Sequence, residues 1–106
     1  MTEASKSSDV LQLERRVLSL LCQEPAVREL GRSNLQHYCW RDLVHKVIFE
    51  IVTRAPQTSA EQLRHQLPTR LTNAGFPDFP WEEFFHPHGF SQQDAEALLL
   101  RLSRSG

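Results

Sequence analysis

The sequence predicts a small all-α helical bundle of about five to six helices. Three observations carry this prediction. Apolar residues recur at three- and four-residue spacing, proline and glycine interrupt that pattern at intervals, and helix-capping residues stand where new stretches begin. A chain of 106 residues has room for one domain, which buries roughly 60–70% of its unfolded surface. We expect a single helical domain over residues 9–104, preceded by a flexible polar leader over residues 1–8.

The first helix is predicted to begin at Asp9, with Gln12 in the third position of a capping box. Its charged residues, Glu14, Arg15 and Arg16, are predicted to form its solvated side. The predicted buried stripe consists of Val10, Leu13, Val17, Leu20 and Leu21. A short second helix over residues 26–30 then follows, opened by Pro25 and closed by Gly31.

Residues 40–54 form the most apolar segment and are predicted to be the central helix of the bundle. A strand is disfavoured because Val47, Ile48 and Phe49 are consecutive, whereas the polar residues recur every four positions. Pro56 ends the helix, since it disfavours helical backbone at the residue before it. The predicted buried face comprises Trp40, Val44, Val47, Ile48 and Ile51. Charges of alternating sign, each able to pair across one turn, stand at Asp42, Lys46, Glu50 and Arg54.

Three further stretches are predicted after Pro56. A capping box formed by Thr58 and Glu61 predicts a helix over residues 59–67, which Pro68 kinks or restarts. Residues 75–90 combine proline with aromatic residues, which is typical of a loop pinned by large side chains. Within it, a short helix opened by Pro80 places on one face Trp81, Phe84 and Phe85.

The last helix is predicted to be capped by Ser91 and Asp94. Its buried face is predicted to comprise Ala95, Leu98, Leu99 and Leu102. Leu100 falls outside that face. It is therefore a candidate for contact with another chain, although single exposed leucines are common.

Composition limits the function classes. The formal charge is −1 and no basic block is present, which disfavours a protein that holds nucleic acid through phosphate contacts. Cys22 and Cys39 stand in apolar surroundings with no signal peptide before them, so we expect two buried, reduced thiols and a cytoplasmic location. No apolar run reaches the ~18–20 residues of a membrane span.

Catalytic and metal-binding patterns were sought among the histidines, cysteines and paired carboxylates. The His86/His88 and His37/Cys39 pairs belong to no recognised ligand framework. The glycines are too dispersed to form a phosphate-binding loop. His45, beside the apolar face of residues 40–54, is expected to bond a backbone carbonyl or to cap a contact. We therefore expect no enzyme activity, no metal and no cofactor.

Two motifs follow each other within residues 11–67. The first is a leucine-rich helix ending in a polar step and proline, Leu20, Leu21, Gln23, Glu24 and Pro25. The second begins a later helix, Trp40, Arg41, Asp42, Leu43 and Val44, which continues with His45, Lys46, Ile48 and Phe49. In this order the motifs resemble the helical domain shared by bacterial DNA primase, where it is the C-terminal helicase-binding domain, and the replicative helicase, where it is N-terminal and shows the pattern matched by the last four residues. The region beyond Pro68 matches no pattern of these families.

The resemblance implies a non-catalytic module that docks onto primase, replicative helicase or a helicase loader, and a bundle that ends in a helical hairpin. Since the hairpin carries much of the contact in those relatives, the implied partner-binding residues are Trp81, Phe84, Phe85, Leu98 and Leu100. A homodimer through the same surface is a further expectation. The alternative is a small nucleic-acid-binding regulator, in which the helix from Ser59 would present Gln62, Arg64, His65 and Gln66.

Overall fold

The computed structural model describes residues 2–54, 57–86, 89 and 91–105, and over these it is all-α. It contains five α-helices and one 3-10 helix, so the predicted fold class is confirmed. The elements are α1 (Thr2–Gln23), α2 (Pro25–Leu35), α3 (Leu43–Arg54), α4 (Ala60–Asn73), η1 (Trp81–Phe85) and α5 (Gln92–Ser105).

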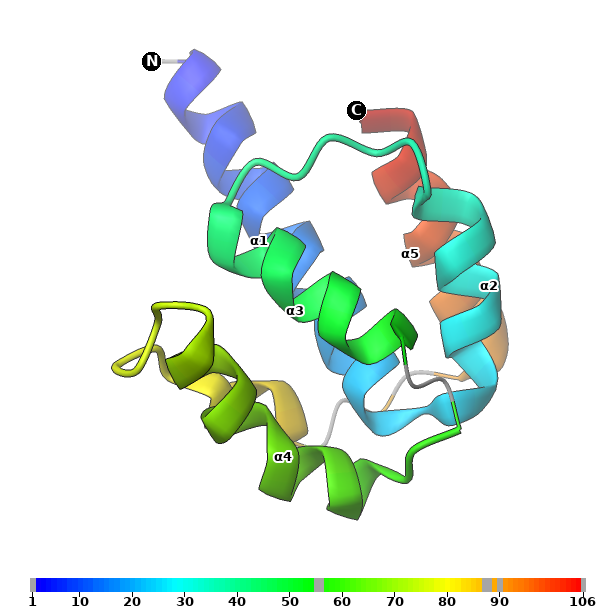
Figure 1. Ribbon diagram of the computed structural model, residues 1–106. Coiled ribbons are helices and arrows are strands. Elements are labelled where there is room, and N and C mark those ends of the chain that lie inside the picture. Colours follow the sequence, from blue (N-terminus) through cyan, green and yellow to red (C-terminus); the bar gives the residue numbers. More distant parts are fainter. Residues whose placement is uncertain (1, 55–56, 87–88, 90, 106) are drawn as a thin grey trace.

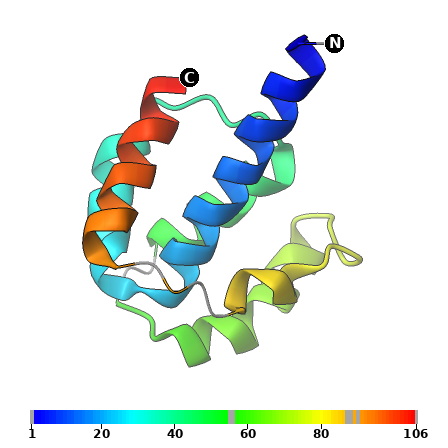
Figure 2. The same ribbon diagram turned by 180° about the vertical axis from the view of Figure 1, so that it is seen from behind.

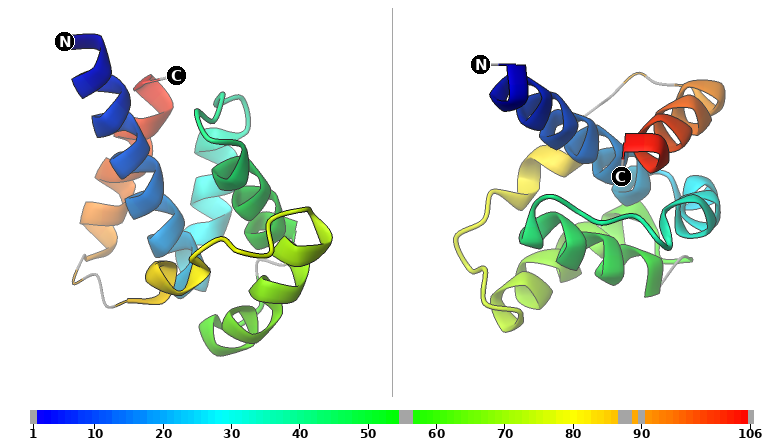
Figure 3. Two further views of the ribbon diagram at one scale, coloured as in Figure 1. Left: turned by 90° about the vertical axis from the view of Figure 1, so that its left-hand side faces the viewer. Right: turned by 90° about the horizontal axis from the view of Figure 1, so that it is seen from above.

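The bundle is organised around α1, which packs against every other element. Figures 1 and 2 show α1 passing between α3 on one side and α5 on the other, with η1 against its C-terminal half. The first turns of α1 and the last turns of α5 lie at the same end of the molecule (Figure 3). The sequence predicted this central place for residues 40–54, and that prediction is wrong. The main packing partners of α3 are α1, α2 and α4.

Two helices are longer than predicted. The α1 helix begins at Thr2 rather than Asp9, because residues 2–8 contain Ala, Glu and Lys, which favour helix, and no proline or glycine. The α2 helix continues through Gly31 to Leu35. Gly31 is a packing residue rather than a helix end, since a Cβ atom there would lie 2.6 Å from Cδ2 of the buried Leu21.

The α3 helix begins at Leu43, so Trp40 precedes it. Asp42 starts the helix, accepting a hydrogen bond from the Val44 amide through Oδ1 at 2.8 Å. Trp40 still packs on the core, with its ring centroid 5.0 Å from those of Tyr38 and Phe49. The predicted helix end at Pro56 lies outside the described residues, and α3 itself ends at Arg54.

The α4 helix is capped one residue later than predicted, by Ser59 and Gln62. It runs through Pro68 without a break, because Leu63, Leu67 and Leu71 place one leucine stripe in the core on both sides of the proline. Gly75 ends it as predicted, with a φ of +99°. The Phe76 amide then bonds the Leu71 carbonyl at 2.8 Å, and the Gly75 amide bonds that of Thr72.

The last helix begins with the predicted cap, in which Asp94 Oδ2 accepts from the Ser91 amide at 3.1 Å and Ser91 Oγ accepts from the Asp94 amide at 3.2 Å. It packs against α1 and α2, whereas η1 packs against α1 and α4. The terminal hairpin implied by the resemblance therefore does not take the form of α5 folded back on its predecessor. On the predicted buried face of α5, Ala95, Leu99 and Leu102 are buried in the core as predicted.

Ten residues of the first and central helices were predicted to be buried, of which Val10 is half-buried. Of the other nine, five are buried and four pack half-buried against the core. The buried ones are Leu13, Val17, Leu20, Leu21 and Ile48. The half-buried ones are Trp40, Val44, Val47 and Ile51. The difference arises because α3 lies at the surface of the bundle, with α1 behind it (Figure 1). One flank of α3 therefore stays open to solvent.

Candidate interaction surface

Phe84 was predicted to contact a partner, and the structure contradicts this prediction because its side chain is only 1% exposed. The ring stacks on Phe79, with centroids 5.8 Å apart, and meets the edge of His45 at 6.4 Å. The tight turn of η1 directs Phe84 into the space between α1, α3 and α4. Phe84 is a core residue and is not available to a partner.

The other four predicted residues lie in two separate places. Trp81 and Phe85 are half-buried on η1, where their rings meet edge to face at 5.9 Å. Leu98 is half-buried on α5, and Leu100 is 46% exposed on its outer face. Since α5 and η1 lie on opposite sides of α1 (Figure 2), these residues do not form one continuous surface. Among the five residues predicted to bind a partner, Leu100 alone has an exposed side chain.

The η1 segment is fastened to α1 by polar side chains of α1. Ser19 Oγ donates to the Phe84 carbonyl at 3.1 Å, and Gln23 Nε2 donates to the same carbonyl at 2.9 Å. Gln23 also donates to the His86 carbonyl at 2.7 Å. These bonds engage the carbonyls of Phe84 and His86, so the described end of the aromatic segment, at residues 84–86, is held against α1.

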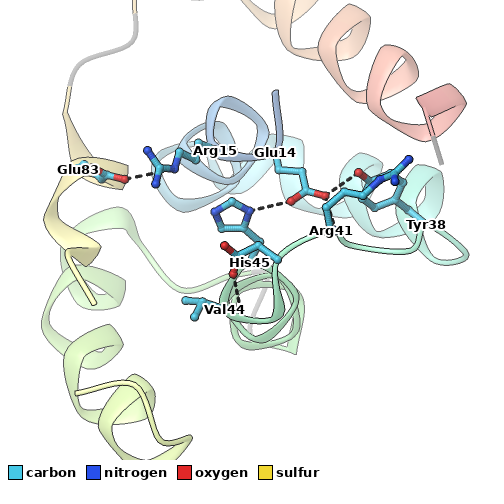
Figure 4. A network of polar contacts seen from close by, with 8 residues as sticks. Glu14, Arg15, Tyr38, Arg41, Val44, His45 and Glu83 are labelled. Carbon is cyan, nitrogen blue, oxygen red and sulfur yellow. Dashed lines mark hydrogen bonds and ion pairs between the residues drawn. The ribbon is translucent and has the colours of Figure 1, made fainter. Parts of the chain in front are cut away.

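A buried carboxylate on α1 was missed by the sequence reasoning, which placed Glu14 on the solvated side. Glu14 is fully buried. Figure 4 shows its two oxygens facing three donors from the α2–α3 connector and α3. Oε1 lies 2.7 Å from Nδ1 of His45, and Oε2 accepts from the Tyr38 hydroxyl at 2.6 Å and from the Arg41 amide at 2.8 Å. We call these four residues the Glu14 network.

Within the Glu14 network, the pKa values of Glu14 and Tyr38 are shifted. Burial by itself would raise the pKa of Glu14, but the hydrogen bonds from His45, the Arg41 amide and Tyr38 outweigh it, so the pKa lies below its ordinary value. Burial and the adjacent carboxylate raise the pKa of Tyr38. Because Glu14 and the His45 ring are both closed off from solvent, a substrate cannot reach them. The network is a structural tie between α1 and α3 rather than an open acid–base site.

The lowered pKa of Glu14 predicts acid sensitivity. A carboxylate whose folded pKa lies below its unfolded value stabilises the fold fully above the unfolded pKa of about 4.5, and this stabilisation is lost as pH falls through the folded pKa. Urea denaturation at pH 5 and at lower pH measures the free energy of unfolding. We expect this free energy to fall less on acidification in Glu14→Gln than in the unaltered domain, because the glutamine side chain does not bind a proton. Equal slopes against pH in the two proteins would contradict the prediction.

A second buried charge, Arg28 on α2, was also not predicted. Its side chain is 1% exposed and donates to the carbonyls of Leu21 at 2.6 Å and Cys22 at 2.9 Å, and to that of Thr58. These two α1 carbonyls lie in the last turn of the helix, where backbone acceptors lack intrahelical donors. Arg28 therefore caps α1 and ties its C-terminal end to the segment before α4. Burial lowers its pKa.

The remaining nucleophiles and metal ligands are dispersed. Within the described part of the chain, no three of the His, Cys, Asp and Glu side chains gather at metal-binding distance. Cys22 is buried as expected, and burial raises the pKa of its thiol to about 12. Cys39 is exposed, which contradicts the prediction of two buried thiols, because the connector that carries it turns Tyr38 and Trp40 inward instead. His88 lies outside the described residues.

An open groove runs between α3 and α4. Its floor is apolar, from Val47 and Ile51, and its rims are polar. The lining residues are Val47, Glu50, Ile51 and Arg54 of α3 and Arg70, Asn73 and Ala74 of α4. At the N-terminal end of α3, Leu43 is 65% exposed, the largest exposure among the large hydrophobic side chains described. This flank of α3 was assigned to the core by the sequence.

Two apolar places are thus accessible on the described surface, one at Leu100 on α5 and one along α3 and the groove beside it. Among the helices described, none is both long and apolar enough to cross a membrane. Comparisons with protein-family models, curated proteins and solved structures found no match to this chain.

Proposed function

We propose that this domain is a non-catalytic protein–protein interaction module, resembling the docking domain of bacterial primase and replicative helicase, that modulates assembly of the replication machinery. The single observation that carries the proposal is the exposure of Leu100 on α5. Its helical neighbours on the outer face, Glu96, Ala97 and Arg104, are exposed as well. A leucine in the centre of a polar helix face is suited to enter an apolar pocket of another protein.

The residues that carry the family resemblance are partly buried and partly exposed. Leu20, Leu21, Ile48 and Phe49 are buried in the core, whereas Arg41, Leu43 and Lys46 are exposed. A pattern of buried residues is expected to accompany a shared architecture rather than a shared binding surface. This supports a related fold, and the choice of partner then depends on exposed residues such as Leu100.

Leu100→Asp is expected to leave the domain folded and to weaken partner binding. Truncating or charging a central interface side chain typically costs about 1–2 kcal/mol or more, which corresponds to roughly 5–30-fold in Kd. The measurement is binding of the purified domain to the host primase, replicative helicase and helicase loader, each immobilised separately. Gln93→Asp, an exposed position on the same helix, is the matched control and should bind as the unaltered domain does.

Three outcomes would count against this proposal. One is the absence of binding to any of the three replication proteins. The second is equal affinity of Leu100→Asp and the unaltered domain. The third is an unfolded Leu100→Asp domain, which would show that Leu100 is a packing residue.

A nucleic-acid-binding regulator is the second candidate, favoured by the outer face of α4. Gln62, Arg64, His65 and Gln66 are all exposed there, and Arg70 follows one turn later. This candidate predicts retention of DNA that weakens steeply as salt is raised, whereas the docking module predicts no retention at ~0.15 M salt. Fluorescence anisotropy with a labelled duplex at two salt concentrations distinguishes the two candidates.

A further inference from the structure

The outward face of α3 is apolar at one end and has a groove along one flank. Leu43 is exposed, and Val47 and Ile51 follow it at four-residue intervals, half-buried on the α4 side. These three side chains make one stripe along the helix. In Figure 1, α3 lies at the front of the molecule, with α1 behind it and α4 below. Leu43 is open to solvent, and Val47 and Ile51 are reached from the groove that they line.

Three charges on this face form no ion pair with another residue that the structure describes. Lys46, Glu50 and Arg54 are exposed, and the ion pairs formed by described residues join other side chains. The sequence predicted pairing between these charges along α3, and the described structure does not show it. These charges alternate in sign beside an apolar stripe. Such a surface is complementary to a partner that presents an apolar stripe and charges of the opposite sign at the facing positions.

The same helix, reversed in direction, has that order. When a second α3 lies antiparallel about a two-fold axis at the level of residue 48, positions 46 and 50 stand opposite each other, as do 42 and 54. Lys46 then faces Glu50 of the second copy, and Arg54 faces Asp42 of the second copy, whose carboxylate also caps its own helix. With a rise of about 1.5 Å per residue, Leu43 lies about 3 Å along the helix axis from Ile51 of the second copy, and the two Val47 side chains are offset by about 3 Å along the same direction.

We propose that two copies of this domain form a symmetric dimer through antiparallel α3 helices. The charge row is self-complementary about residue 48 and the apolar stripe about residue 47, a difference of about 1.5 Å along the helix, so one two-fold axis brings both close to their copies, as a symmetric interface requires. The end of α4 with Arg70, Asn73 and Ala74 completes the rim. A contact built on one helix and a groove edge lies at the small end of specific interfaces, so the dimer is weak, with a Kd in the range of roughly 1–100 μM.

A charge-swap series tests this register. Sedimentation velocity over a concentration series from about 1 μM to about 1 mM measures the Kd of the unaltered domain, of Lys46→Glu and of Glu50→Lys. Each single variant places like charges opposite each other on both sides of the axis, and we expect its dimer to be at least about tenfold weaker. An equimolar mixture of the two variants restores opposite charges, and so does the double variant. Both should dimerise as the unaltered domain does.

Several results would overturn the proposal. They are a monomeric unaltered domain at about 1 mM, single variants that dimerise normally, or a mixture that stays monomeric. If the α3 variants instead weaken binding to a replication protein, the face belongs to that protein. The dimer is independent of the proposed function, because Leu100→Asp lies on α5 and should leave the dimer intact. Circular dichroism melting confirms that each variant, altered only at exposed positions, remains folded.

Discussion

Replacing Glu14 with leucine is expected to destabilise the domain by about 3–5 kcal/mol, because it leaves the buried donors of Tyr38, Arg41 and His45 without their acceptor. Leucine is similar in size and apolar, so the loss reports the missing acceptor rather than a cavity. Small domains are stable by only about 5–15 kcal/mol, and the change therefore removes a large part of the total. Urea denaturation at pH 7 followed by circular dichroism measures it.

Glu29→Leu is the matched control. Glu29 is also a helical glutamate, but its side chain is 69% exposed and its contact is a surface pair with Arg32 at 3.9 Å. Such a change is expected to alter stability by no more than about 0.5 kcal/mol. Equal effects at Glu14 and Glu29 would mean that the Glu14 network does not form in solution.

The fold class could be predicted because helix signals are local. Capping residues such as Ser91 and Asp94 and the positive φ of Gly75 act within a few residues of their own position, and each does what its sequence context indicates. Gly31 and Pro68 were misjudged because the decisive contacts are distant. Leu21 packs over Gly31, and the core leucines of α4 hold the helix together across Pro68.

The candidate surface was harder to predict, because the same residue types serve the core and an interface. An aromatic residue such as Phe84 gives no local sign of which role it has, and the stack on Phe79 and the edge contact with His45 decide it. Glu14 stands beside Arg15 and Arg16 in the sequence, and this charged neighbourhood predicts an exposed side chain. The donors for this buried carboxylate come from the α2–α3 connector and from α3, more than twenty residues later along the chain. Leu100 was found because its position outside the leucine stripe of α5 is itself a local pattern.

Ile48→Asp is expected to unfold the domain. Ile48 is fully buried in the hydrophobic core, and an aspartate there would place a charge among apolar side chains. The cost of an unpaired buried charge is several kcal/mol, added to the lost burial of about 1.5–3 kcal/mol for the isoleucine side chain. The sum approaches the whole stability of a small domain. Circular dichroism and one-dimensional proton NMR of the purified variant at pH 7 measure the outcome.

Leu43→Asp is the matched control, since it introduces the same side chain at the other face of the same helix. Leu43 is 65% exposed, so the aspartate remains in water and stands in the first turn of α3, where a negative charge is favoured by the helix dipole. We expect this variant to melt cooperatively at close to the unaltered temperature while its self-association weakens. Unfolding of Leu43→Asp, or a folded Ile48→Asp, would mean that α3 presents a different face to the core. In that case the antiparallel register proposed for the dimer would also fail, because Lys46 and Glu50 would no longer lie outward.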